Sequence, residues 1–109
     1  MTFKYISPIN NLEELKQYRR EYKFLLFLEK TLKQSSINDL EELLSDLVLY
    51  STKFQAIYIK SKLKRYAELE LLAVNNEGYY VLNVQRFKMY KNQLQLAIQE
   101  GSKLYNRYS

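Results

Sequence analysis

The 109-residue chain has no cysteine, no histidine and no tryptophan, and it has only two glycines and one proline. Without imidazole and thiol groups, it lacks the usual neutral-pH proton shuttle, the soft metal ligands and a thiolate nucleophile. Carboxylates remain, but Glu13–Glu14 and Glu41–Glu42 are adjacent pairs whose side chains diverge by about 100° on a helix. We therefore expect a noncatalytic protein that has no catalytic residues, no metal and no cofactor.

Long apolar runs are also missing. The longest, Phe24 to Leu28, is far shorter than the ~20 residues that span a bilayer. The amino terminus shows no basic stretch followed by an apolar core, and the lack of cysteine fits a reducing compartment. We expect a cytoplasmic protein that does not enter a membrane.

Few glycines and prolines favour long helices over a many-stranded sheet. Apolar residues at helical spacing predict a first helix from Leu12 to about Gln34 and a terminal helix from Phe87 to Tyr105, which Gly101 could fray. Between them the pattern runs from Leu40 to Leu72 as one helix or two, and Ser51 and Thr52 are attractive caps for a second helix.

Two similar segments, at 7–15 and 36–43, each place serine or asparagine before paired glutamates, which is typical of helix starts. Pro8 would suit a first helical position after Ser7, although the capping residue is open by a few positions. Each start is interpreted as an independent helix and not as part of a repeat.

Residues 69–84 are ambiguous, because residues suited to strands flank the sequence Asn75-Asn76-Glu77-Gly78. These four residues predict either a helix stop or the turn of a β-hairpin. The predicted fold class is all-α, a compact antiparallel bundle of three or four helices in a single helical domain over residues 1–109. The alternative is an α+β fold with a β-hairpin around residues 69–84.

The formal net charge of +5 is unevenly distributed. Residues 36–50 are acidic, whereas residues 51–66 contain five lysines and arginines and no carboxylate. On a helix, Lys53, Lys60 and Lys64 fall near one face, with Ile57 between them and Arg65 adjacent. Lys53, Lys60, Lys64 and Arg65 are the candidate anion-binding residues. The alternative is an ordinary solvated face, and the pattern does not contain a recognisable helix-turn-helix signature.

Eleven tyrosines are interleaved with basic residues, a mixture that can stack on unpaired bases or pack at the edge of a core. Four of them follow the predicted core period: Tyr18, Tyr22, Tyr66 and Tyr90. The core accounts least for four others, which are the candidate protein-interface residues: Tyr79, Tyr80, Tyr105 and Tyr108.

The leading hypothesis is a small protein-binding module that acts as an adaptor or inhibitor, since tyrosine and arginine concentrate binding energy at interfaces. The alternative is a protein that binds single-stranded nucleic acid or RNA through a basic, tyrosine-containing helical face. A third interpretation is a self-associating structural protein, for instance a homodimer. The bias toward lysine, asparagine, isoleucine and tyrosine is typical of AT-rich genomes and suggests, by analogy alone, an accessory protein of a phage or mobile element.

Overall fold

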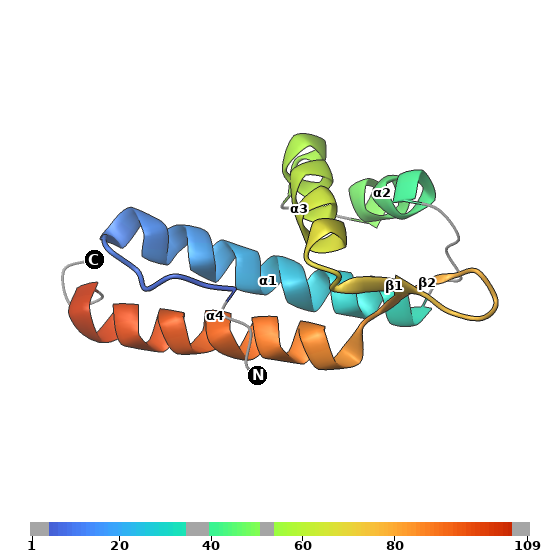
Figure 1. Cartoon of the computed structure of the whole chain (residues 1–109). Helices are drawn as coiled ribbons and strands as arrows, with labels where there is room; N and C mark the ends of the chain where they lie inside the picture. The colour runs from blue at the N-terminus through green and yellow to red at the C-terminus, as the bar shows by residue number, and fades with distance from the viewer. Residues whose placement is uncertain (1–4, 35–39, 51–53, 106–109) are drawn as a thin grey trace. The chain divides into compact units, whose positions relative to one another are not determined.

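The computed structural model of the protein describes residues 5–34, 40–50 and 54–105 (Figure 1). Its elements follow the order α1 (Leu12–Gln34), α2 (Leu40–Tyr50), α3 (Ala56–Glu68), β1 (Leu72–Val74), β2 (Tyr80–Leu82) and α4 (Val84–Tyr105). The described chain is mostly helical, as predicted, and the first helix has the expected bounds. It also contains the hairpin that we kept as the alternative, so the fold includes a small antiparallel sheet.

Asn11 begins α1. Its side-chain Oδ1 accepts a hydrogen bond from the Glu14 backbone N–H at 2.8 Å, and its Nδ2 lies 3.4 Å from the Glu14 carboxylate. This reciprocal pair satisfies amides that the first turn leaves without a partner. The cap is therefore Asn11 rather than Ser7, and Pro8 precedes the helix.

The described residues divide into two packing units, and the single-domain interpretation stays a prediction. Unit 1 takes its described residues from Met1–Leu26 and Lys88–Ser109. Within it, α1 and α4 run antiparallel, since Arg19 bonds to Ser102 near the end of α4 and Glu21 bonds to Tyr90 near its beginning. Ile9, Leu15 and Ala97 form a buried cluster in this unit.

Gly101 lies inside α4 and is buried, so the expected fraying there is wrong. A Cβ at this position would lie 2.8 Å from Ile9 Cδ1 and 3.3 Å from both Ile9 Cβ and Leu15 Cδ1. The missing side chain lets the segment before α1 pack directly against α4, which offsets the low helix propensity of glycine.

A carboxylate is buried in unit 1. Glu21 is 6% exposed, and its Oε2 accepts a hydrogen bond from the Tyr90 hydroxyl at 2.5 Å. The Tyr5 ring lies 5.8 Å from the Tyr90 ring, and the Tyr5 backbone N–H donates to Gln93 Oε1. Because a buried carboxylate needs hydrogen-bond donors, this contact helps to fix how α1 and α4 align in unit 1.

Unit 2 spans Phe27–Phe87, and within it α2 packs against α3 and α3 contacts β1. Helix α3 begins after the N-cap Gln55, which makes no side-chain capping bond. The predicted caps Ser51 and Thr52 lie outside the described residues. The buried residues of this unit come from all of its elements: Leu28, Leu32, Leu43, Leu47, Ile59, Leu63, Tyr66, Leu71, Leu72 and Phe87.

A tight bend joins α3 to the hairpin. Glu70 takes the left-handed backbone conformation with φ of 60°, and the Leu71 N–H donates to the Tyr66 carbonyl at 2.9 Å. At the far end of the hairpin, the Asn83 N–H donates to the Leu71 carbonyl, and Asn83 then caps α4. The hairpin is thus hydrogen-bonded at its base to the residues that end α3.

The turn of the hairpin is built by Asn75. Its Oδ1 accepts hydrogen bonds from the backbone N–H groups of Glu77 and Tyr79, and Gly78 adopts a φ of 86°. The strands pair with Leu72 opposite Leu82 and Val74 opposite Tyr80. The asparagine and glycine that predicted a helix stop therefore form a strand turn, because α3 has already ended at Glu68.

Candidate functional site

Helix α3 has one buried face and one exposed face. Ile59, Leu63 and Tyr66 are buried at spacings of four and three residues. Since successive residues are about 100° apart, the opposite side carries a set of exposed residues that we call the outer face of α3. It is centred on Ile57, Ser61, Lys64 and Glu68 and flanked by Lys60 and Arg65.

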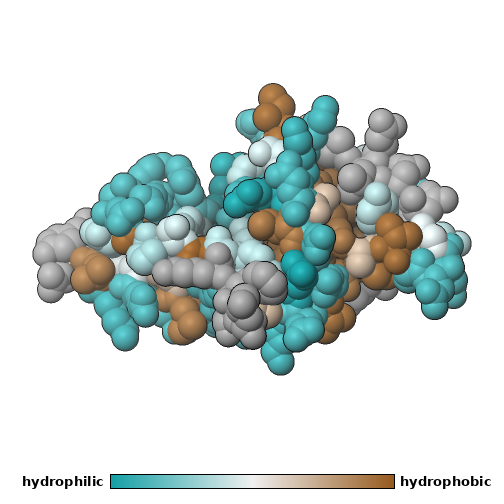
Figure 2. Space-filling model, in the orientation of Figure 1, coloured by the Kyte–Doolittle hydropathy of each residue, from teal (hydrophilic) through white to brown (hydrophobic). Residues whose placement is uncertain are grey.

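The outer face of α3 is positively charged. Lys60, Lys64 and Arg65 are exposed, and none of them forms an ion pair with a carboxylate of the described residues. Glu68 is the one acidic residue on this face. Figure 2 shows hydrophilic side chains over much of α3, with apolar surface at its N-terminal end. The structure thus brings three of the four predicted anion-binding residues onto one helix, and Lys53 lies outside the described residues.

Aromatic rings beside this face are already stacked. The Phe54 ring lies 5.5 Å from the Tyr58 ring and 6.2 Å from the Phe27 ring, nearly parallel to both. Lys62 Nζ lies 5.6 Å from the centre of the Tyr58 ring, within cation–π range. The sequence reasoning missed this row of rings, and the signal that could have found it was the spacing of four between Phe54 and Tyr58 and again between Tyr58 and Lys62.

Tyrosine is therefore not the exposed element of the α3 surface. Tyr66 is fully buried, and Tyr58 is half-buried in its stack. Stacking on unpaired bases requires accessible ring faces. Cationic side chains, rather than rings, are what α3 presents to solvent.

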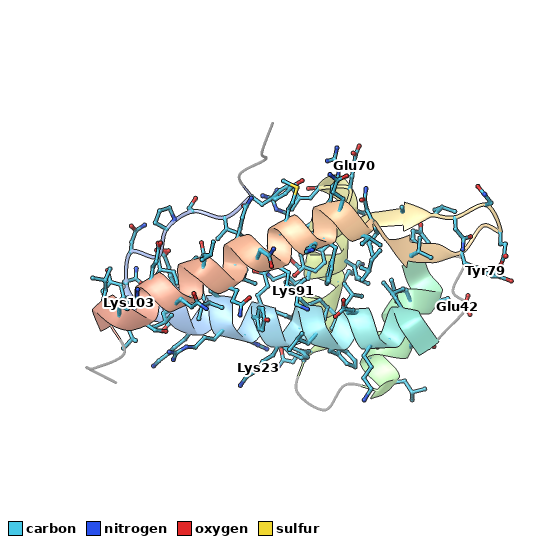
Figure 3. The ribbon with its side chains drawn as sticks, turned by 90° about the horizontal axis from the view of Figure 1, so that it is seen from below. Lys23, Glu42, Glu70, Tyr79, Lys91 and Lys103 are labelled. Carbon is cyan, nitrogen blue, oxygen red and sulfur yellow. The ribbon has the colours of Figure 1, made fainter. Side chains whose placement is uncertain are left out.

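The hairpin carries two of the predicted interface tyrosines. Tyr79 and Tyr80 are both half-buried, and Tyr79 lies next to the turn (Figure 3). The Tyr79 backbone is held by Asn75, while the Tyr80 backbone pairs with Val74. Both rings remain partly accessible, and nothing in their placement identifies a partner.

Tyr105 is better explained by packing than the sequence suggested. Its ring packs against the cluster of Ile9, Leu15 and Ala97, and its hydroxyl donates to the Asn10 carbonyl at 2.8 Å. The expectation that the core does not account for Tyr105 is therefore corrected. Tyr108 lies outside the described residues.

Several large apolar side chains are exposed. Ile57 is 83% exposed and Leu49 on α2 is 73% exposed, although both follow the apolar pattern that predicted a buried stripe. The core register of α3 is set by Ile59, which is fully buried. Sequence periodicity missed this shift, because Ile57 and Ile59 both fit an apolar pattern and only tertiary packing selects between them.

Groups that could hold a metal were sought among the described residues. No cluster of three or more acidic, histidine or cysteine side chains with that capacity occurs there. The buried contact between Glu21 and Tyr90 belongs to the packing of unit 1. Among the described helices, none combines the length and the hydropathy that a bilayer-spanning segment requires.

Comparisons with known proteins leave the chain without a relative. No family model matches the sequence, and neither the curated proteins nor the solved structures include a significant match.

Proposed function

We propose that the chain is a noncatalytic nucleic-acid-binding module of the cytoplasm, and that the outer face of α3 holds the phosphates. The observation that carries this proposal is the exposure of Lys60, Lys64 and Arg65 on one side of one helix, without a carboxylate partner among the described residues. Cations that are not neutralised within the fold remain available to a polyanion.

The strength of such binding depends on salt. Each phosphate that a protein neutralises on B-form DNA contributes a slope of about −0.9 to the dependence of log K on log salt. Three cations would give about −2.7, or about a 40-fold loss of affinity between 50 and 200 mM salt. An apolar protein interface would not weaken in this way.

Fluorescence anisotropy with labelled oligonucleotides tests the proposal. The test variant combines Lys60→Ala, Lys64→Ala and Arg65→Ala, all at exposed helical positions where alanine is well tolerated. We expect this variant to lose most of the low-salt affinity of the wild type.

A matched control removes the same number of charges elsewhere. Lys16, Lys23 and Lys103 are exposed helical residues of unit 1, and their triple replacement by alanine should leave most of the binding intact. Equal losses in both variants would show a general attraction without a site on α3. Absence of wild-type binding at low salt would end the proposal.

Protein binding, as an adaptor or inhibitor, is the second candidate. Val48 and Leu49 are neighbours on α2 and are 41% and 73% exposed. Adjacent exposed apolar side chains favour burial against another protein. Affinity purification from the native host with wild type and Leu49→Asp tests this candidate, which predicts a stoichiometric partner that the variant loses. Sedimentation of the same two proteins tests the homodimer.

A further inference from the structure

We infer that the ligand is duplex DNA, and that α2 and α3 act as a helix-turn-helix whose second helix enters the major groove. This inference rests on the proposed function and specifies its ligand. The two helices follow one another, pack together and are joined by residues 51–55. Figure 1 shows them crossing steeply rather than lying side by side, as the two helices of this motif do.

The fit of α3 to a groove follows from its dimensions. A helix with its side chains is about 10–12 Å wide, and the major groove of B-form DNA is about 12 Å wide. Helix α3 has 13 residues, so it is about 20 Å long. From Ile57 to Lys64 the outer face rises by about 10 Å, which is about three base-pair steps.

The residues along this face match base edges rather than phosphates alone. Ile57, at the first turn, offers an apolar surface that suits the C5 methyl group of thymine. Ser61 offers a hydroxyl that can donate or accept, and Lys64 can donate to the O6 and N7 atoms of guanine. Lys60 and Arg65 flank the row and are placed to reach the backbone on either side.

The buried and stacked rings favour a duplex over a single strand. Tyr66 is fully buried, and Tyr58 is packed between Phe54 and Lys62, so α3 does not offer the exposed rings on which unpaired bases stack. The major groove of duplex RNA is too narrow for side chains to read. Duplex DNA is the nucleic acid whose groove accepts a helix with this surface.

The base of the hairpin holds α3 in position for this role. Leu71 bonds back to Tyr66, the last buried residue of α3, and Asn83 bonds to Leu71. Glu70 and Arg86 form an ion pair of 3.3 Å across the same junction. An outer face that is rigidly supported loses little conformational entropy when it binds.

Selection from a random-sequence duplex pool tests the inference. We expect the wild type to enrich a site of a few base pairs that contains thymine and guanine, and to bind that duplex at least tenfold more tightly than a shuffled duplex or its single strand. Replacing the selected thymine by deoxyuridine removes only the methyl group, and it should weaken wild-type binding about fourfold.

Two variants separate base reading from phosphate binding. Ile57→Ala should be insensitive to the thymine-to-deoxyuridine change, because the side chain that contacts the methyl group is gone. Lys60→Ala should weaken binding to all duplexes alike and reduce the salt slope by about 0.9. Leu49→Ala, at an exposed apolar position on α2, is the matched control and should retain the deoxyuridine effect.

The outcomes distinguish the two proposals. Binding without sequence enrichment, or tighter binding to single strands, would overturn the duplex inference and leave phosphate binding by α3 standing. A deoxyuridine effect that persists in Ile57→Ala would overturn the assignment of that residue. Failure to bind any nucleic acid at low salt would remove both proposals.

Discussion

Gly101 provides a quantitative test of the packing in unit 1. An alanine Cβ there would lie 2.8 Å from Ile9 Cδ1, closer than such atoms normally approach, and 3.3 Å from Leu15 Cδ1. Alanine gains about 1 kcal/mol over glycine in a helix interior, whereas overpacking a core costs about 1–3 kcal/mol. We expect Gly101→Ala to lower the free energy of unfolding by roughly 1 kcal/mol.

The contact with Ile9 can be tested by a double-mutant cycle. Ile9→Val removes the Cδ1 atom and alone should cost about 0.5–1.5 kcal/mol. In the Gly101→Ala background the same deletion also relieves the close contact, so it should cost little. The predicted coupling energy is about 1 kcal/mol in favour of the double variant.

Urea unfolding of the wild type, both single variants and the double variant measures this coupling, with unchanged m values as the check on two-state behaviour. Gly78→Ala is the control, because Gly78 has a φ of 86° and no atom within 4 Å of its Cβ position. Backbone strain should destabilise Gly78→Ala without any coupling to Ile9→Val. Additive effects at Gly101 and Ile9, or a Gly101→Ala variant more stable than wild type, would refute the packing argument.

Three other measurements address particular contacts. Tyr90→Phe should lower the free energy of unfolding by roughly 1.5–3 kcal/mol, because the buried Glu21 carboxylate loses a hydrogen-bond donor, and urea unfolding should detect it. Glu70→Gly should raise the melting temperature, since relief of a positive φ, about 1 kcal/mol, outweighs an ion pair whose carboxylate is largely exposed. Burial, followed by nearby glutamates, raises the pKa of Tyr18 above its ordinary value near 10. The folded state therefore keeps Tyr18 neutral at a pH where the unfolded chain ionises, so the unfolding free energy should fall as the pH rises above 10, and less steeply in Tyr18→Phe.

Much of the helical content follows from the sequence. The first helix has the predicted bounds because its apolar stripe is long and regular and because Asn11 and Glu14 form a local cap. The terminal helix was likewise indicated by its period, and Phe87, Tyr90 and Leu94 are buried as that period predicts.

The hairpin and the register of α3 depend on tertiary contacts. Residues around Asn75 and Gly78 favour a turn in either fold, and the Asn83–Leu71 bond that closes the hairpin joins residues distant along the chain. Ile57 and Ile59 have the same hydropathy, so periodicity alone does not decide which one is buried. Gly101 was interpreted as a weak point because its packing partner, Ile9, lies far away in the sequence.

The candidate site shows the same division. The block of lysines and arginines before Tyr66 is visible in the sequence, and its exposure on α3 follows from helical spacing. The engagement of Tyr58 with Phe54 and Lys62 requires the folded chain. That contact shifts the proposed binding mode from base stacking toward a helix that presents cations.

The difference in salt dependence between the wild type and the Lys60→Ala, Lys64→Ala, Arg65→Ala variant tests the central claim most directly. The outer face of α3 predicts that the slope of log K against log salt for duplex DNA becomes shallower by about 2.7 when the three cations are removed. A variant that binds with the wild-type affinity and an unchanged slope would show that the nucleic acid, if bound at all, does not contact α3.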